Sequence, residues 1–405
     1  MRRISIAAMV VIQCAAANVF AQVASPEVAP PATSAASAPI QQPDDLGPKL
    51  NDLIAKHNLP AMAAIAIRGD QVIARGVAGV RKQGDDTRVT IDDRWHLGSC
   101  TKAKTATLCA ILVERGKLRW DSTLAEVFPD LADRMHADYK PVTLAQLLTN
   151  RGGVPGDLKF DGLWGKLWNF TGSPREARRV LLEGVVTRPP PHPPGSKYEY
   201  ANASFAIAGH MAEVIMDKPF EELMREHLFV PLGMTSAGWG APGGDADADQ
   251  AQPAAPWGHR RGGEPMDPHD RGADNPEAIS PAGRAHCTID DWARFVALHL
   301  RAGRLNPDRS CRLLSAETFD RLHTPPDDLK DYAYGWSRPE RPWGGPKGER
   351  FVLTHGGSNT MWFCVTWVAP TRDFAVLVCC NSGVAAAPKA CDEMSATLIR
   401  EYLKD

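Results

Sequence analysis

The order of apolar patterns along the chain predicts an α+β fold, in which a sheet built from both chain ends carries an inserted, mainly helical subdomain. Strand-like runs occur near the two ends, at 61–77 and 361–380, and helical patterns fill most of the residues between them. The composition agrees, because 43% hydrophobic and 23% charged residues are ordinary values for a globular protein. These values exclude a wholly disordered chain, a collagen-like fibre and a protein with many membrane spans.

The net charge gives no support for nucleic-acid binding. The 405 residues include 46 Lys and Arg against 48 Asp and Glu, so the formal net charge is −2. Proteins that bind nucleic acid usually concentrate basic residues on one surface, because they must neutralise phosphates. We therefore expect no nucleic-acid partner.

The N-terminus has the pattern of a cleavable export signal. Arg2 and Arg3 precede an apolar run from Ile4 to Ile12, and small residues lie before a cleavage point near residue 21. The apolar run is too short to span a bilayer, and the alternative is a short N-terminal anchor. We expect a signal peptide at 1–21, export to the bacterial periplasm or the medium, and no integral membrane span after cleavage.

The segment 22–45 contains five prolines and six alanines but no aromatic residue, so it predicts a flexible linker. Residues 46–405 are then expected to form one domain. Its sheet subdomain would comprise about 46–98 and 285–405, and its helical subdomain about 99–284.

The predicted elements follow one another in a consistent order. Apolar residues at helical spacing predict helices, and runs rich in β-branched residues predict strands. Gly69 and Asp70 form a turn signal between two strands, and Gly116 ends a helix. In chain order we expect a helix at 46–57, strands at 61–68 and 71–77, helices at 99–115, 142–149, 203–216, 220–227 and 288–302, strands at 361–368 and 374–380, and a helix at 390–403.

Residues 241–283 are rich in Gly, Asp, Ala and Pro and predict a long surface excursion. No H-E-x-x-H or C-x-x-C spacing supports a metal site in the chain. We therefore expect a solvated loop and no bound metal at the histidines and aspartates of this segment, which are His259, Asp267, His269, Asp270 and Asp274.

Eight cysteines would remain after removal of the signal peptide. Cys364, Cys379 and Cys380 lie in apolar, strand-like runs, so we expect them to be buried as small hydrophobic residues. The sequence leaves the question of disulfide pairing open.

The sequence Ser99-Cys-Thr-Lys102 places a hydroxyl and an amine three residues apart. If Ser99 opens a helix, Lys102 lies one turn further along the same face. A serine hydroxyl becomes a good nucleophile when a base takes its proton, and a partly desolvated lysine can be that base. The alternative is a helix-capping serine followed by a solvated lysine.

Two further motifs carry groups that suit the same chemistry. Tyr200 and Asn202 form the only Y-x-N among the six tyrosines, and they can relay a proton and donate to a substrate carbonyl. The alternative is a tyrosine and an asparagine packed at a helix start. In His355-Gly-Gly357-Ser358, glycines would let a substrate backbone lie close to the following strand, and one N–H could complete an oxyanion pocket.

Together these motifs resemble those of the serine β-lactamase and penicillin-binding-protein superfamily. The HLGSCTK sequence around Ser99 is similar to the nucleophile helix of class C β-lactamases and of related D-aminopeptidases, DD-peptidases and esterases. The resemblance covers about residues 46–405. Further similar stretches follow in family order, namely VTLAQLLTNRGGVP at 142–155, PGSKYEYANASFAIAGHMAE at 194–213, PLGMTSAGWG at 231–240, SPAGRAHCTIDDWARF at 280–295, YGW at 334–336 and THGGSNTMWF at 354–363.

The resemblance implies a β-lactamase/transpeptidase-like fold with an antiparallel sheet, and an acyl-enzyme mechanism that needs no cofactor. Ser99 would be the acylated nucleophile, and Lys102 and Tyr200 would form the proton-transfer pair. Asn202 would orient the substrate amide. The backbone N–H groups of Ser99 and Ser358 would form the oxyanion hole.

The sequence departs from the family pattern where this chain has His355-Gly356-Gly357, because β-lactamases of this class usually have Lys-Thr-Gly there. A fixed lysine attracts a substrate carboxylate, whereas a histidine can be neutral near pH 7 and glycine has no hydroxyl. Both changes favour a peptidase, an amidase or an esterase over an efficient β-lactamase.

We therefore predict an exported serine hydrolase that acts through an acylated Ser99 on an amide, a D-amino-acid peptide or an ester. Its partner is a small-molecule or peptide substrate, and a monomer is favoured. Two alternatives stay open: a class C-like β-lactamase proper, and a penicillin- or cell-wall-binding protein without turnover. Trp336 and Trp362 are candidate cleft residues.

Overall fold

The structure is a computed structural model that describes residues 42–245, 252–300, 313–326 and 332–403. The expected signal peptide at 1–21, and most of the expected linker, lie outside these described residues. Among the helices of the described part, none is long and apolar enough to cross a membrane.

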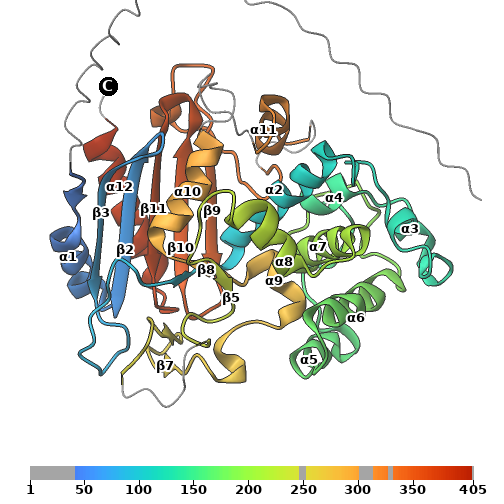
Figure 1. Cartoon of the computed structure of the whole chain (residues 1–405), viewed down its shortest axis with the longest axis horizontal. Helices are drawn as coiled ribbons and strands as arrows, with labels where there is room; N and C mark the ends of the chain where they lie inside the picture. The colour runs from blue at the N-terminus through green and yellow to red at the C-terminus, as the bar shows by residue number, and fades with distance from the viewer. Residues whose placement is uncertain (1–41, 246–251, 301–312, 327–331, 404–405) are drawn as a thin grey trace, which may run out of the picture. The chain divides into compact units, whose positions relative to one another are not determined.

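A six-stranded sheet is the largest element of the described chain (Figure 1). Its strand order is β1-β3-β2-β11-β10-β9, so early strands pair with strands from the C-terminal part. All neighbours are antiparallel except the short β1, which is parallel to β3. The predicted sheet from both chain ends is thereby confirmed. The bounds are β1 Asp44–Asp45, β2 Ala61–Arg68, β3 Gln71–Gly79, β9 Leu353–Ser358, β10 Phe363–Ala369 and β11 Phe374–Cys380.

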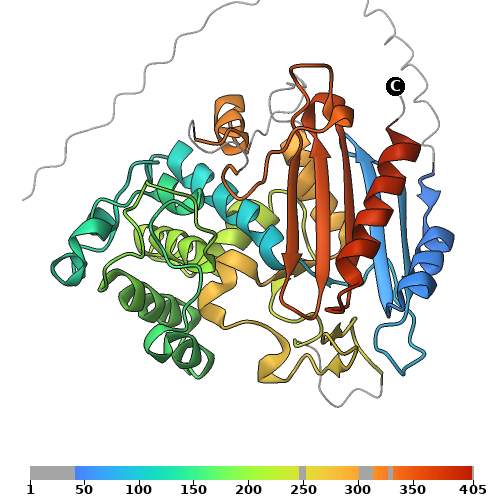
Figure 2. The ribbon, with the colours of Figure 1, turned by 180° about the vertical axis from the view of Figure 1, so that it is seen from behind.

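The two central strands are apolar on both faces. All residues of β11 are buried, and in β2 only the last residue, Arg68, is exposed. Strands of this kind occur where both faces of a sheet are covered. Helices α1 (Gly47–His57) and α12 (Ala387–Tyr402) cover one face, with α12 in front of the sheet in Figure 2, and α10 (Ile289–Leu300) covers the other.

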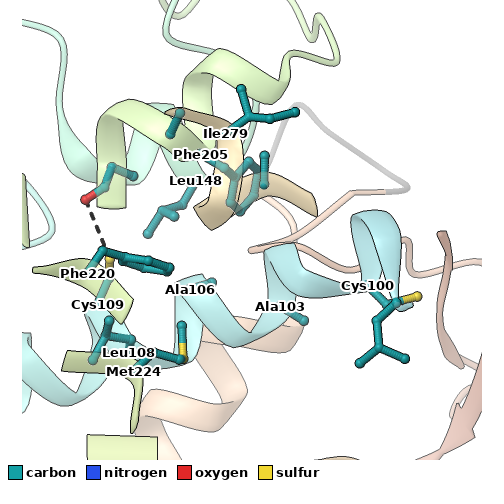
Figure 3. Packing of buried hydrophobic residues seen from close by; sticks show 14 of the residues in the cluster. Cys100, Ala103, Ala106, Leu108, Cys109, Leu148, Phe205, Phe220, Met224 and Ile279 are labelled. Atoms are coloured by element: carbon teal, nitrogen blue, oxygen red, sulfur yellow. Dashed lines mark hydrogen bonds between the residues drawn. The ribbon is translucent and has the colours of Figure 1, made fainter. Parts of the chain in front are cut away.

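Helix α2 (Thr101–Glu114) leads from the sheet into the helical region and is buried all round. Every residue from Thr101 to Leu112 is buried, as expected of a helix inside a core. Figure 3 shows part of the cluster of apolar side chains around it. The neighbouring helices are α3 (Leu124–Val127), α4 (Leu144–Leu148), α5 (Leu163–Trp168), α6 (Pro174–Val186), α7 (Asn202–Met216), α8 (Phe220–Met224) and α9 (Ser280–Gly283).

Short strands join the helical region to the sheet. β8 (Ala285–Cys287) pairs with both β4 (Trp95–His96) and β5 (Gly238–Trp239), and β6 (Gly258–His259) pairs with β7 (Pro265–Met266). The sequence did not predict them, because strands of two or three residues are too short to show an alternating pattern.

The expectation of a surface excursion at 241–283 is wrong for parts of this segment. His259 is fully buried and its Nδ1 lies 2.6 Å from the carbonyl oxygen of Asn381, while Asp274 is buried against His96. Both side chains have partners far away in the sequence. A composition rich in Gly, Asp and Pro cannot reveal such partners, so the polar residues looked solvated.

Several helix predictions needed adjustment. The helix expected at 220–227 is divided into α8 and a wider π-helical turn, Arg225–Phe229. The helix expected from Ser99 begins as a 3₁₀ turn, Gly98–Cys100, before α2. Helix α6 and helix α11 (Ala316–His323) were not predicted.

Candidate active site

Ser99 lies in a tight turn between β4 and α2. Gly98 adopts a φ of +46°, a left-handed conformation that favours glycine. A Cβ at this position would lie 2.3 Å from the backbone nitrogen of Ser358, so only glycine lets the turn approach β9 this closely. The 3₁₀ turn continues directly into α2, which puts Lys102 one helical turn after Ser99 on the same side.

The Ser99 hydroxyl has two partners. Lys102 Nζ lies 3.1 Å from Ser99 Oγ, and the hydroxyl of Tyr200 donates to the same oxygen at 2.7 Å. The structure therefore brings together the three residues that the sequence motifs singled out. The capping alternative is wrong for this pair, because Lys102 is buried rather than solvated and Ser99 makes no side-chain cap.

Lys102 Nζ has two further neighbours, the Oδ1 of Asn202 at 2.7 Å and the carbonyl oxygen of Ala282 at 2.8 Å. Its side chain is fully buried, and no carboxylate of the described residues pairs with it. Burial disfavours the charged amine and lowers the pKa of Lys102 to about 7. A substantial fraction of Lys102 is therefore neutral near pH 7, as a base requires.

Tyr200 and Asn202 flank the start of α7. Burial raises the pKa of Tyr200 above its ordinary value of 10, so its phenol stays protonated and donates to Ser99. Asn202 accepts a hydrogen bond from Lys102 through Oδ1, and this fixes the direction of its amide. Its Nδ2 has no protein partner among the described residues and remains available to a substrate carbonyl.

Asn150 holds the Tyr200 segment in place, and the sequence analysis did not assign it a role. The Asn150 side chain accepts from the Ala201 N–H at 3.2 Å, and its carbonyl accepts from the Glu199 N–H at 2.9 Å. Asn150 has a φ of +56°, a conformation that asparagine tolerates better than most residues. Its place in the LLTN segment was the signal that could have identified it.

β9 is the edge strand of the sheet and lies directly beside the Ser99 turn. A Cβ on Gly357 would lie 2.0 Å from the carbonyl oxygen of Leu97. The missing side chain of Gly357 therefore leaves room for Leu97, and the contact of this strand with a substrate backbone stays a prediction. Ser358 follows Gly357 and is exposed, with its backbone nitrogen next to Gly98.

His355 is buried at the site and is surrounded by aromatic rings. Its ring centroid lies 6.3 Å from that of Tyr200 and 6.1 Å from that of Tyr332. Its Nδ1 lies 2.6 Å from the carbonyl oxygen of Gly356 on the same strand. Tyr198 packs against Tyr332 at 5.2 Å, so three tyrosine rings and the His355 ring form one cluster, in which Tyr198 and Tyr200 are exposed and Tyr332 and His355 are buried.

Trp336 and Trp362 are not cleft residues, because their exposed fractions are 2% and 1%. Trp336 stacks on Phe295, and Trp362 packs edge-on against Trp95. Sequence reasoning did not single out Tyr332, a buried residue whose ring packs against those of Tyr198 and His355. It comes two residues before the YGW motif, and its packing partners lie far away in the sequence.

The seven cysteines of the described chain are free and buried. This confirms the prediction for Cys364, Cys379 and Cys380, and it shows no disulfide between these seven residues. No group of three or more His, Cys, Asp or Glu residues in the described segments is arranged to hold a metal ion.

The chain matches the β-lactamase family model over residues 45–399. It is 26% identical over 360 residues to penicillin-binding protein 4 of Amycolatopsis lactamdurans, covering 84% of this chain and 85% of that protein. It is 25% identical over 304 residues to the unguisins hydrolase ungD' of Aspergillus campestris, covering 72% of this chain and 54% of that protein.

Solved structures agree on the fold. The D-alanine carboxypeptidase AmpC of Burkholderia cenocepacia superposes with a TM-score of 0.65 at 19% identity, over 87% of this chain and 97% of that one. A penicillin-binding protein homologue from Pyrococcus abyssi gives a TM-score of 0.67 at 20% identity, over 88% of this chain and 77% of that one. With a family match over most of its length and a β-lactamase/transpeptidase-like fold, the chain belongs to the β-lactamase family of serine hydrolases.

Proposed function

We propose that this protein is an exported serine hydrolase that forms an acyl-enzyme on Ser99 and releases the acyl group to water. The observation that carries the proposal is the contact of Ser99 Oγ with both Lys102 Nζ and the Tyr200 hydroxyl, at 3.1 and 2.7 Å. A nucleophile within hydrogen-bond reach of a buried base is the arrangement that nucleophilic catalysis requires.

The hydrogen bonds around Lys102 support its role as the base. A neutral amine has two N–H donors and one lone pair, and Asn202 Oδ1 and the Ala282 carbonyl can accept only from the donors. The lone pair then remains for the Ser99 hydroxyl proton. As Ser99 Oγ attacks the substrate carbonyl carbon, this proton passes to Lys102 and the carbonyl oxygen becomes an oxyanion.

We assign the backbone N–H groups of Ser99 and Ser358 to this oxyanion. Ser99 belongs to the first turn of its helix, where N–H groups have no partner within the helix. Collapse of the intermediate breaks the bond to the leaving group, which takes a proton from Lys102, directly or through Tyr200. Water then attacks the acyl-enzyme with Lys102 again accepting a proton, and Ser99 is restored.

For the substrate we propose an amide, a D-amino-acid peptide or an ester without a required carboxylate. Within the described part of the chain, Lys102 is the one cationic side chain that contacts Ser99, and it is buried and hydrogen-bonded to protein groups. His355 and Gly356 stand where a lysine and a hydroxyl would attract a carboxylate. The exposed aromatic rings of Tyr198 and Tyr200 favour an apolar or aromatic group on the substrate.

A turnover panel tests this function. Purified protein is assayed with short-chain nitrophenyl esters, D-alanyl peptides and a chromogenic β-lactam, beside Ser99→Ala and the surface control Ser196→Ala. We expect turnover of an ester, amide or D-peptide that Ser99→Ala abolishes and Ser196→Ala retains. Equal turnover by Ser99→Ala would contradict the assignment of Ser99.

The same panel separates the two alternatives. Rapid hydrolysis of the β-lactam with no ester or peptide turnover would indicate a β-lactamase proper. Labelling of Ser99 in a single slow event, without repeated turnover of any substrate, would indicate a penicillin- or cell-wall-binding protein.

Export and a monomeric state complete the proposal. The export signal predicted at 1–21 supports release to the periplasm or the medium. N-terminal sequencing of the protein from a periplasmic fraction should give a mature chain that begins near residue 22. Light scattering of that protein should give the mass of one chain.

A further inference from the structure

Behind the Ser99 turn lies a buried histidine–aspartate pair that the proposed reaction does not use. His96 Nε2 lies 2.9 Å from Asp274 Oδ2, and the exposed fractions of the two side chains are 0% and 4%. The pair joins β4, which precedes the nucleophile turn, to the segment before α9. These residues are 178 positions apart in the chain.

The ring of His96 also forms a hydrogen bond with the turn that carries Ser99. The Gly98 N–H donates to His96 Nδ1 at 3.1 Å, so Nδ1 must be unprotonated. The ring proton is then on Nε2 and faces Asp274. Asp274 therefore fixes both the tautomer and the ring orientation of His96, and His96 in turn holds the backbone of Gly98, the residue before Ser99.

A second contact of Asp274 reaches the end of β9. Asn359 Nδ2 donates to Asp274 Oδ1 at 3.1 Å and to the Ala273 carbonyl at 3.3 Å. Asn359 directly follows Ser358, and its own Oδ1 accepts from the Met361 N–H at 3.2 Å. One buried carboxylate thus holds both backbone segments that carry the proposed oxyanion donors.

Two further donors anchor Asp274 itself. Its Oδ1 accepts from the Asn275 N–H at 2.8 Å, and its Oδ2 lies 3.3 Å from Arg284 Nε. Burial alone would raise the pKa of Asp274, but His96 and Arg284 hold it below its ordinary value. Both of its oxygens accept hydrogen bonds from groups on separate segments of the chain, so the position of the carboxylate is fixed by several contacts.

We propose that Asp274 is a positioning residue that sets the spacing between the Ser99 and Ser358 N–H groups through its hydrogen bonds with His96 and Asn359. The inference rests on the proposed function, because it assigns this spacing to an oxyanion hole. Such donors act only when they are held at the position of the developing charge. A displacement of about 1 Å can cost roughly 100-fold in rate, so a support that joins both donors matters for the chemistry.

The test compares Asp274→Asn with Glu213→Gln. Glu213 is a matched control, since it is also buried and accepts from a histidine and an arginine, His210 and Arg178, both at 3 Å or less. It lies eleven residues along α7 from Asn202, about 17 Å away at the α-helical rise. Either substitution should lower the melting temperature.

Only the Asp274 variant should slow the chemistry. We expect Asp274→Asn to lower kcat, and the labelling rate of Ser99 by a fluorophosphonate, about 10- to 100-fold, with KM changed less than about threefold. Glu213→Gln should leave both rates within about twofold. Asn359→Ala removes one hydrogen-bond partner of Asp274 and leaves the carboxylate in place, so it should lower kcat by a smaller factor. This variant provides the test if Asp274→Asn fails to fold.

Coupling between Asp274 and His96 is the second readout. His96→Asn keeps an acceptor for the Gly98 N–H but breaks the contact with Asp274, so it should cost kcat in the wild-type background and little more in Asp274→Asn. Wild-type labelling rates in folded Asp274→Asn or Asn359→Ala would overturn this inference without affecting the proposed function. A loss of rate in Glu213→Gln equal to that in Asp274→Asn would do the same. A wild-type protein that no serine probe labels would overturn the proposed function as well.

Discussion

Lys102 differs from a surface lysine because its amine is buried and meets only neutral oxygen atoms. Ser99, Asn202 and the Ala282 carbonyl each lie within 3.1 Å of Nζ, and the rings of Tyr200 and Phe205 lie 4.7 and 5.7 Å away. None of these groups carries a negative charge that would favour the ammonium. In the proposed reaction, the protonation state of this one side chain therefore controls whether Ser99 can be activated.

The pH dependence of kcat/KM tests this control. In the proposed mechanism the neutral form of Lys102 is the base, and burial lowers its pKa to about 7, so kcat/KM should rise with pH through about 7. Below this pKa the rate should fall about tenfold per pH unit, because the fraction of neutral amine falls by that factor. Tyr200 should add no loss below about pH 10, because burial raises its pKa.

A profile measured from pH 5 to pH 10 on one ester substrate is sufficient. Lys102→Met should remove the rising limb together with about 100- to 10,000-fold of the rate, the range typical for loss of a general base. A wild-type rate that stays flat between pH 5 and pH 9 would contradict the assignment of Lys102.

His355 and Gly356 give a prediction about specificity. His355→Lys combined with Gly356→Thr should restore groups that attract a carboxylate, and a charged hydrogen bond contributes about 1.5–3 kcal/mol. We expect kcat/KM for a substrate with a carboxylate to rise about tenfold or more relative to a neutral ester. The ratio of the two substrates is the measurement, and an unchanged ratio would show that these positions do not select against carboxylates.

At the scale of single residues, the sequence predicted those site residues that belong to motifs with a recognisable spacing. Ser99 and Lys102 share one helical turn, so their proximity follows from local geometry. Tyr200 could be identified from its motif. Asp274 and Tyr332 could not, because their roles depend on partners that are distant in the chain and appear in no local pattern.

At the scale of elements, the site is made where the 3₁₀ turn before α2 meets the edge strand β9. Gly98 and Gly357 face each other across this contact, and each occupies a place where a Cβ would lie within 2.3 Å of the opposite backbone. Protein interiors at this density transmit even small displacements. The position of Ser99 relative to Ser358 therefore depends on glycine, which has no side chain, at both positions 98 and 357.

Gly357→Ala tests this contact against Gly356→Ala on the same strand. A Cβ on Gly357 would lie 2.0 Å from the Leu97 carbonyl, so the strand or the turn must move, which costs about 1–3 kcal/mol. A Cβ on Gly356 would meet nothing closer than 3.7 Å. Thermal unfolding should show a clear loss of stability for Gly357→Ala only, and equal melting temperatures would contradict the close approach.

The elements that could be predicted are those with a long periodic pattern. Helix α7 and strands β2, β3 and β11 were found within a few residues of their bounds. β9 was not predicted as a strand, since its Leu-Thr-His-Gly-Gly-Ser sequence lacks a clear alternation and contains two glycines, which are depleted in strands. The segment 241–283 was misjudged because its burial depends on tertiary contacts.

At the scale of the molecule, the sheet and the helical region meet along the line of Ser99, Lys102 and α7. The sheet supplies His355 and Ser358 from β9, and the helical region supplies Tyr200 and Asn202. Neither part carries a complete site. The order of strands and helices predicted a sheet formed from both chain ends with the helices inserted between its strands in the sequence.

The central claim is that Ser99 forms a covalent acyl-enzyme. The most direct measurement is intact mass spectrometry after reaction with a slowly deacylated ester or β-lactam, followed by peptide mapping. We predict one added acyl group on the peptide that contains Ser99, and none in Ser99→Ala. An acyl group on another residue, or substrate turnover with no adduct in rapidly quenched wild-type samples, would contradict this account.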